Sequence, residues 1–417
     1  MELKLNKRDF LEHLMQLCTL NEKTRCLVLI EINNSTHVAS FLQGFEAEQE
    51  VANQVEQLIL THISRHQKVV LGKLGNNQFG LVLPNTIEET ERIATDLADA
   101  IDQSYIQIQE QRYYPKLYLG ISPLTPEYTE FQFAFAAARE ALHQASITGG
   151  STVKILTPNA PKLIQYRNSL TLLPIIRREG LLNKHFVLFA QPIVPLNPDS
   201  TEKKCEILLR YKDADGNFNA PYPYLLAANM FHVTRDIDVY VITQFCHFMQ
   251  TNTDTETVYS INISGNTVRY AQFLQVISTL FQQYNIDTRR VCFEITEDIA
   301  SQDIDDAQIL MHALKQQLGC QLSLDDIGIG SSNFETLPKF DVDYMKIDGS
   351  YIQDLLTNPY SEMVVAFISQ AAKLEGKKTV AEYVECPEQL DKLTAMGIDY
   401  GQGYLLGKPK LLFDPSS

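Results

Sequence analysis

The sequence predicts an α/β protein of two domains, in which a mixed α/β sheet domain precedes a TIM-like (β/α)8 barrel. The chain has 417 residues, more than one ordinary domain usually contains. Its apolar runs also become regular near residue 186. We therefore expect a first domain over residues 1–157, a linker region with a helix over 158–185, and the barrel over 186–417.

The first domain alternates between helical and strand patterns. Phe10, Leu14 and Leu17 have the spacing of one helix face, and Gly75-Asn76-Asn77 has the composition of a turn between two strands. The expected order is a helix around Phe10, a strand at 26–32, a helix at 45–63, two strands within 68–84, a helix at 87–103, a strand at 117–122 and a helix at 131–145. This order is typical of a mixed α/β sheet.

The second domain contains eight short apolar runs, and we expect a helical pattern after each. The runs cover residues 186–194, 205–211, 259–264, 291–296, 321–326, 344–348, 379–384 and 400–406. Eight strands with intervening helices in about 230 residues are typical of a (β/α)8 barrel.

Polar residues recur within or at the ends of these runs. They are Glu206, Asn262, Glu294, Asp325, Asp326, Lys346, Asp348, Glu382 and Gln402. In such barrels the carboxyl ends of the strands converge on one face, where active sites lie. Taken alone, each acidic residue is more often solvated or a helix cap, and Asp348 before Gly349 could cap the next helix. Gln402 between two glycines could be a loop residue. Recurrence in seven of the eight runs favours a convergent site.

Carboxylates crowded together repel one another and raise one another's pKa, a cost that bound divalent cations remove. Oxygen ligands without His or Cys favour Mg²⁺ or Mn²⁺ over zinc. Two such ions can activate water and support an in-line displacement at phosphorus. The sequence therefore predicts a two-metal site.

Composition limits the other classes of function. The formal net charge of −16 argues against DNA binding and against a polybasic membrane contact. No apolar run approaches the roughly 20 residues of a transmembrane helix. The seven cysteines are scattered singly, which is typical of reduced thiols. We expect a cytoplasmic protein without a membrane span.

The barrel motifs resemble the EAL family in their order along the chain. Glu206–Arg210 resembles the EAL signature, and Gln191–Ile193 resembles the motif of the entry strand. Asn-Ile-Ser at Asn262, Glu-Ile-Thr-Glu at Glu294, the Asp pair, Lys-Ile-Asp, Ala-Glu-Tyr-Val-Glu and Gln-Gly-Tyr follow in the order of the family. The resemblance covers about residues 175–412.

The resemblance implies hydrolysis of cyclic di-GMP to pGpG with two Mg²⁺ or Mn²⁺ ions. It implies that the metal ligands are Glu206, Asn262, Glu294, Asp325, Asp326 and Glu382. Of these, Glu206, Asp326 and Glu382 would act in catalysis together with Lys346. The implied substrate-binding residues are Gln191, Leu209, Arg210, Gln402 and Asp348, and Glu297 would anchor the loop after the fifth strand.

Three segments depart from the pattern of the family. The loop over 325–333 loses a Phe, a Thr and a Tyr, and Ile329 replaces the Thr. Asn229 stands where the family has Glu, and His232 where it has Gly. Tyr383 is a bulky residue at another position where the family has Gly. These changes would reshape the rim of the site without removing a ligand.

The first domain resembles a GGDEF domain that has lost its chemistry. Residues Gly75, Asn76, Asn77, Gln78 and Phe79 stand where the family has Gly-Gly-Asp-Glu-Phe, so the turn is kept and the carboxylates are lost. The Arg-x-x-Asp inhibition motif would fall on His66–Val69 and is absent. The resemblance implies a pseudo-cyclase that does not make cyclic di-GMP.

Three hypotheses remain open at this point. The chain could be an active cyclic di-GMP phosphodiesterase, favoured by the complete ligand set, or a receptor that binds cyclic di-GMP and signals through a protein partner. Third, the barrel surface could serve protein contacts alone. EAL barrels often pair, so we expect a homodimer through this domain, and the GGDEF-like domain is a candidate surface for a protein partner.

Overall fold

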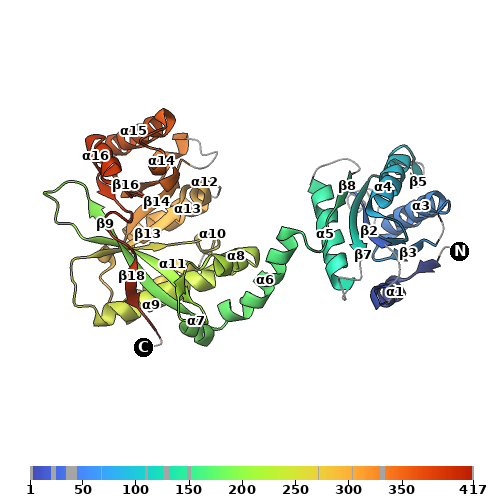
Figure 1. Cartoon of the computed structure of the whole chain (residues 1–417), viewed down its shortest axis with the longest axis horizontal. Coiled ribbons are helices and arrows are strands. Elements are labelled where there is room, and N and C mark those ends of the chain that lie inside the picture. Colours follow the sequence, from blue (N-terminus) through green and yellow to red (C-terminus); the bar gives the residue numbers. More distant parts are fainter. Residues whose placement is uncertain are drawn as a thin grey trace. The chain divides into compact units, whose positions relative to one another are not determined.

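The computed structural model describes residues 3–19, 25–33, 45–66, 68–108, 111–124, 131–147, 152–270, 272–302, 304–328 and 334–415. The chain divides into two compact units, Met1–Arg167 and Asn168–Ser417 (Figure 1). The first unit is an α/β sheet and the second is a closed barrel, so the predicted fold class is confirmed.

A six-stranded sheet forms the centre of the first unit, in the order β1-β3-β4-β2-β7-β8. Its strands are β1 (Leu3–Leu5), β2 (Arg25–Ile32), β3 (Val70–Lys73), β4 (Gln78–Leu83), β7 (Leu117–Leu124) and β8 (Thr152–Ile155). A separate hairpin pairs β5 (Ile106–Ile108) with β6 (Gln111–Tyr113). Because β1–β3 and β7–β8 are parallel and the other pairs are antiparallel, the sheet is mixed, as predicted.

Two pairs of helices cover the two faces of this sheet. Val28 and Ile30 of β2 pack with α3 (Phe45–Ile63) and α4 (Ile87–Asp102). The alternate residues Leu27 and Leu29 pack with α1 (Lys7–Thr19) and α5 (Phe131–Ile147). Successive side chains of a strand point to opposite faces, so β2 must be apolar throughout, which explains its unbroken hydrophobic run.

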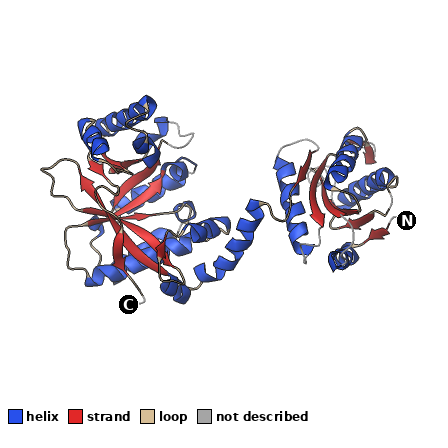
Figure 2. Cartoon of the chain, viewed as in Figure 1, coloured by secondary structure: helices blue, strands red, loops and turns tan. Residues whose placement is uncertain are grey.

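Eight strands close the barrel of the second unit, and helices surround them (Figure 2). The strands are β9 (Phe186–Pro195), β10 (Lys204–Lys212), β12 (Val258–Asn262), β13 (Val291–Thr296), β14 (Gln321–Ile327), β15 (Tyr344–Ile347), β16 (Lys378–Ala381) and β17 (Tyr400–Gly401). β9 pairs with both β10 and β17, which closes the ring. Two short strands, β11 (Phe218–Asn219) and β18 (Lys410–Phe413), lie outside it.

The first barrel strand runs against its neighbours. β9 is antiparallel to both β10 and β17, whereas the pairs from β10 to β17 are parallel. Residues 196–203 join β9 directly to β10, and the element after β17 is the strand β18. The prediction that a helix follows every apolar run is therefore wrong for the first and the last run. Antiparallel neighbours need only a short connection, whereas parallel neighbours need a long crossover.

The helices of the second unit pack around the barrel. They are α6 (Pro161–Ile176, whose first turns belong to the first unit), α7 (Glu179–His185), α8 (Tyr222–Met230), α9 (Thr234–Thr251), α10 (Gly265–Val268), α11 (Phe273–Gln283), α12 (Glu297–Gln302), α13 (Ile304–Gln316), α14 (Gly349–Gln353), α15 (Pro359–Leu374) and α16 (Pro387–Ala395), with 3-10 turns at Thr288–Arg290 and Phe334–Lys339. Ile176 and Leu182, within the expected linker, belong to the barrel core. Among the helices described, none has the length and apolar character that crossing a membrane requires.

Candidate active site

The candidate active site lies at the carboxyl ends of the parallel strands. Asn262, the last residue of β12, is in register with Glu294 of β13. Ala381 of β16 is in register with Gly401 of β17, so the next residues, Glu382 and Gln402, lie at one level. The register of a parallel barrel thus brings residues from distant parts of the sequence together.

A cavity of about 320 Å³ opens beside these strand ends. Its lining consists of Gln191, Glu206, Leu208, Arg210, Glu382, Tyr383, Glu385, Gln402, Gly403, Tyr404 and Pro409. The lining includes carboxylates, the Arg210 guanidinium and the aromatic rings of Tyr383 and Tyr404. This combination suits a ligand that has both an anionic group and a flat ring.

Lys346 lies at the centre of the carboxylates. Its ammonium is 2.8 Å from Glu382, 2.9 Å from Glu294, 3.0 Å from Asp325 and 3.5 Å from Glu206, and only 1% of its side chain is exposed. Burial acts to lower the pKa of Lys346, but the four carboxylates outweigh burial and hold the pKa well above its usual value. The lysine is therefore a fixed positive charge.

Two side-chain amides hold Glu206. Asn262 donates to Glu206 Oε1 at 2.8 Å, and Gln402 donates to Glu206 Oε2 at 2.7 Å. The same Gln402 amide lies 3.3 Å from Gln191 Oε1. Burial acts to raise the pKa of Glu206, but Lys346 and the two amides outweigh it, so the pKa is lowered and the carboxylate stays ionised.

The other carboxylates hold protons more tightly than usual. Burial is the main cause that raises the pKa of Glu294 to about 7 and that of Glu382 to about 8; repulsion from Glu206 and Asp325 adds to it, and Lys346 opposes it. Burial and the neighbouring Asp325 raise the pKa of Asp326 to about 6. One ammonium does not balance the charge of this cluster.

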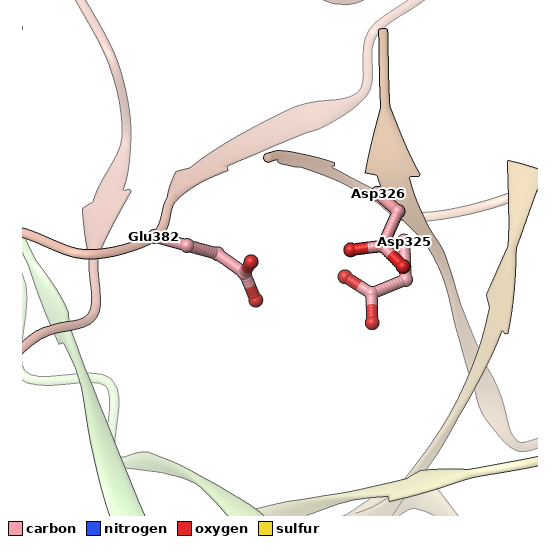
Figure 3. A group of neighbouring side chains, drawn as sticks. All are labelled: Asp325, Asp326 and Glu382. Atoms are coloured by element: carbon pink, nitrogen blue, oxygen red, sulfur yellow. The ribbon is translucent and has the colours of Figure 1, made fainter. Parts of the chain in front are cut away.

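Asp325 and Asp326 are consecutive, yet both carboxylates face the same site. In a regular strand they would point to opposite faces. Here the β14–β15 register shifts between Leu324 and Ile327, and Asp326 has a left-handed φ of 57°. A bulge of this kind redirects one side chain. As a result, oxygens of Asp325, Asp326 and Glu382 all lie within 4.8 Å of one another, and the three side chains point toward a common space (Figure 3).

The cluster fits divalent metal ions. Its donors are carboxylate and amide oxygens, which Mg²⁺ and Mn²⁺ prefer. Among the described residues, the buried oxygens Glu294 Oε1 and Gln402 Oε1 have no hydrogen-bond partner. Four carboxylates surround the Lys346 ammonium and Asp326 adds a fifth to the cluster, so the positive charge of bound ions would compensate the remaining repulsion.

The expected substrate-binding residues of β10 separate to two sides of the strand. Arg210 lines the cavity, and its guanidinium donates to the Leu209 carbonyl at 2.8 Å. The Leu209 side chain packs against the barrel core, whereas Leu208 lines the cavity. The sequence analysis did not name Leu208, although its alternation with Glu206 and Arg210 along one strand predicts that it shares their face.

Two further expected residues have local structural partners. The Asp348 carboxylate accepts a hydrogen bond of 2.8 Å from Ser350 N and caps α14, which is the alternative role considered for it from the sequence. The buried Glu297 carboxylate accepts a hydrogen bond of 3.0 Å from Gly328 N, directly after β14. The departures at 329–333 lie outside the described residues.

The two substitutions at glycine positions occupy left-handed backbone. His232 has a φ of 53° and Tyr383 a φ of 55°. This region costs roughly 1–2 kcal/mol for a residue with a Cβ and little for glycine. The backbone at both positions therefore favours glycine, but this chain has His232 and Tyr383 there.

The hairpin between β3 and β4 of the first unit carries the residues that stand in place of the Gly-Gly-Asp-Glu-Phe motif. Its side chains are amides at the positions where that motif has carboxylates. Gln78 donates to the Glu31 carboxylate at 2.6 Å across the β2–β4 pair. Asn76 and Asn77 lie in the turn before β4, and the Asn77 carbonyl accepts from Ile32 N at 2.9 Å. Gly75 and Phe79 flank the turn, with Phe79 fully buried.

Two family models match this chain. The EAL domain model matches residues 176–409, more than half of the sequence. The chain belongs to the EAL domain family. The model of the diguanylate cyclase GGDEF domain matches residues 5–152, so the protein combines a GGDEF domain with an EAL domain in tandem.

Two curated relatives are similar over more than half of the chain. The cyclic di-GMP phosphodiesterase PdeF of Escherichia coli (strain K12) is 34% identical over 270 residues, 62% of this chain and 36% of that protein. The cyclic di-GMP phosphodiesterase PdeB of Shewanella oneidensis is 30% identical over 352 residues, 82% of this chain and 40% of that protein. The alignments therefore span about two fifths of the length of these relatives.

Solved structures share the fold. The PaMucR phosphodiesterase in its c-di-GMP complex is 25% identical, with a TM-score of 0.53, over 58% of this chain and 97% of that chain. The S helix–GGDEF–EAL portion of Vibrio cholerae LapD is 17% identical, with a TM-score of 0.51, over 96% of this chain and 94% of that chain. At that identity, the second likeness shows the fold alone.

Proposed function

We propose that the EAL domain is a cyclic di-GMP phosphodiesterase that hydrolyses its substrate to pGpG with two Mg²⁺ or Mn²⁺ ions. The observation that carries the proposal is the convergence of the carboxylates and Lys346 beside a cavity that also contains Arg210. The similarity to PdeF and PdeB supports the same substrate.

The residues that would hold the ions are Glu206, Asn262, Glu294, Asp325, Asp326 and Glu382. When bound, the ions would supply Lewis-acid activation of a water and of the phosphodiester. Lys346 keeps the carboxylates together, and as a permanent cation it would orient the attacking water and offset phosphate charge. Gln402 orients Glu206 through its amide.

Substrate recognition would fall to the cavity. Arg210 would pair with a phosphate, since its planar guanidinium suits bidentate contacts with phosphate oxygens. Gln191 on β9 and Gln402 at the end of β17 would contact the substrate side by side, since these two strands are neighbours. Leu209 and Asp348 would then act indirectly, through the packing of β10 and the start of α14.

The GGDEF domain would be an inactive regulatory domain. A cyclase needs carboxylates at the hairpin to hold Mg²⁺, and Asn76, Asn77 and Gln78 are neutral. Glu31, on the paired strand β2, accepts the Gln78 amide at 2.6 Å. We expect this domain to offer a surface to a protein partner, and the EAL domain to form a homodimer.

A receptor that binds cyclic di-GMP without cutting it is the second candidate. Tyr383 favours it, because this residue places a large side chain directly after Glu382 in a backbone conformation suited to glycine. A strained, bulky residue beside a catalytic carboxylate could hold substrate in a pose that is not cleaved.

Incubation with cyclic di-GMP and Mg²⁺ or Mn²⁺, with pGpG followed by chromatography, tests the proposal. We expect metal-dependent pGpG that Glu206→Gln abolishes, because this variant keeps the shape of the side chain and loses the charge. The matched control is Glu202→Gln, whose carboxylate pairs with Lys378 at the opposite end of the barrel. If the protein binds cyclic di-GMP in Ca²⁺ but forms no pGpG in Mg²⁺ or Mn²⁺, the receptor hypothesis replaces the phosphodiesterase hypothesis. Turnover by the Glu206→Gln variant would refute the assigned site.

A further inference from the structure

Tyr383 combines an unfavourable backbone with an exposed aromatic ring. Its φ is 55°, although it has a Cβ, and 53% of its surface is exposed. Non-glycine residues in this region cost on the order of 1–3 kcal/mol and cluster at functional sites. The strain points to a role for the ring that a glycine could not supply.

Gly349 holds one side of the ring. A Cβ on Gly349 would come within 2.1 Å of Tyr383 Cδ2 and 2.7 Å of Cγ, so the ring lies directly on the bare backbone at the start of α14. Any side chain at residue 349 would displace the ring. The Gly349 backbone therefore supports one side of the ring.

Tyr383 is also part of the cavity beside the strand ends. Tyr383 lines it together with Arg210, Glu206, Gln402 and Tyr404. The half-buried Arg210 supplies a cation for a phosphate, and the carboxylates supply the metal-binding wall. An aromatic ring that is supported on one side and lies beside a cationic side chain offers a nucleobase a surface for stacking.

We infer that Tyr383 is a base-stacking residue, which packs against one purine of the cyclic dinucleotide and increases affinity for it. The inference rests on the proposed substrate and goes beyond the proposed reaction. Every nucleobase has a flat face that can stack, so Tyr383 would increase affinity without adding specificity for one base. It acts on substrate binding, whereas Glu382 beside it acts on the metal.

Three variants of residue 383 test the inference through the dissociation constant for cyclic di-GMP in Ca²⁺, which removes turnover from the measurement. We expect Tyr383→Gly to weaken binding by about tenfold or more, the order found for a lost base–aromatic stack. Tyr383→Leu should lose most of the affinity, because it keeps bulk without a ring, and Tyr383→Phe should restore it. A 2-aminopurine analogue should be quenched by the wild type and by Tyr383→Phe, but not by Tyr383→Gly.

Two further readouts separate stacking from a structural role. Tyr383→Gly should raise KM with kcat unchanged, and Mn²⁺ binding measured by titration should keep its affinity. A fall in kcat together with weaker Mn²⁺ binding would instead make Tyr383 a support for Glu382 and would overturn the inference. Equal affinity in the wild type and in Tyr383→Gly would also overturn it. Failure of the wild type to bind cyclic di-GMP would refute the proposed function itself.

Discussion

The Lys346 ammonium lies 2.8 Å from the Glu382 carboxylate, in a pair that is almost fully buried on the lysine side. Removing one member of a buried pair leaves an uncompensated charge and typically costs about 3–5 kcal/mol. We expect Lys346→Met to lower the free energy of unfolding of the metal-free protein by that order, measured by urea denaturation in EDTA.

Lys378→Met provides the matched control for Lys346→Met. Lys378 pairs with Glu202 at 2.9 Å, but the two side chains are 45% and 52% exposed. Exposed pairs contribute roughly 0–1 kcal/mol because water and salt screen them. Equal losses in the two variants would contradict the central role of Lys346.

The raised pKa values of Glu382, about 8, and Glu294, about 7, predict how the metal-free protein responds to pH. In the unfolded chain both carboxyl groups titrate near pH 4.3, so between pH 5 and pH 8 the folded state binds more protons. The free energy of unfolding in EDTA should therefore fall as pH rises through this window.

Glu382→Gln and added Mg²⁺ check this pH dependence. The variant removes one of the two groups, so the decline from pH 5 to pH 8 should be shallower than in the wild type. Mg²⁺ should stabilise the wild type more at pH 8 than at pH 5, because the ligands must be deprotonated to bind. Parallel curves for the wild type and the variant in EDTA would refute the shift at Glu382.

The sequence predicted the barrel and the convergence of its carboxylates because both depend on periodic signals. Apolar runs of strand length predicted β10 and β13, and the polar residues within these runs, Glu206 and Glu294, were predicted to belong to the site. The reversal of β9 carries no such signal, since an apolar run looks the same in either direction. The bulge that turns Asp326 toward Asp325 depends on the fit between β14 and β15, a tertiary property.

Short strands and one unusual backbone conformation also escaped prediction. β1 and β8 are edge strands of three and four residues, too short for a periodic pattern. For Asp348 the sequence left two roles open, a substrate contact and a cap of the next helix, and the contact with Ser350 N shows the cap. Tyr383 was recognised as a departure, but its left-handed backbone became visible only in the structure.

Gly328, directly after β14, combines a left-handed backbone with a close neighbour. Its φ is 106°, and a Cβ there would lie 2.8 Å from the Tyr351 ring. Gly328→Ala therefore adds both backbone strain and a clash, and we expect a loss of about 2–4 kcal/mol in the free energy of unfolding, with weaker Mn²⁺ binding. Chemical denaturation and metal titration measure the two effects.

Gly376→Ala isolates the backbone contribution to that loss. Gly376 also has a positive φ, 67°, but a Cβ there would meet nothing within 4 Å. We expect a cost of about 1 kcal/mol and unchanged Mn²⁺ binding. If Gly328→Ala matched Gly376→Ala in both measurements, the contact with Tyr351 would have no part in shaping the site.

Helix α15 offers a surface for the proposed homodimer. Its exposed apolar residues Tyr360, Met363, Phe367 and Leu374 are spaced by three, four and seven residues, so they form one stripe. Antiparallel pairing of two such helices about a two-fold axis near Phe367 would bring Glu362 of one copy near Lys373 of the other. Such an interface contacts the same residues on both copies.

A double variant, Met363→Glu with Phe367→Glu, tests this surface by sedimentation velocity. The charges would face each other across the two-fold axis in a dry interface, so we expect the dimer to dissociate to monomer. Ile309→Glu is the matched control, since Ile309 on α13 is 68% exposed and lies outside the stripe. If the double variant still sediments as a dimer, the interface does not lie on α15. A wild type that sediments as a monomer at micromolar concentration would refute the homodimer.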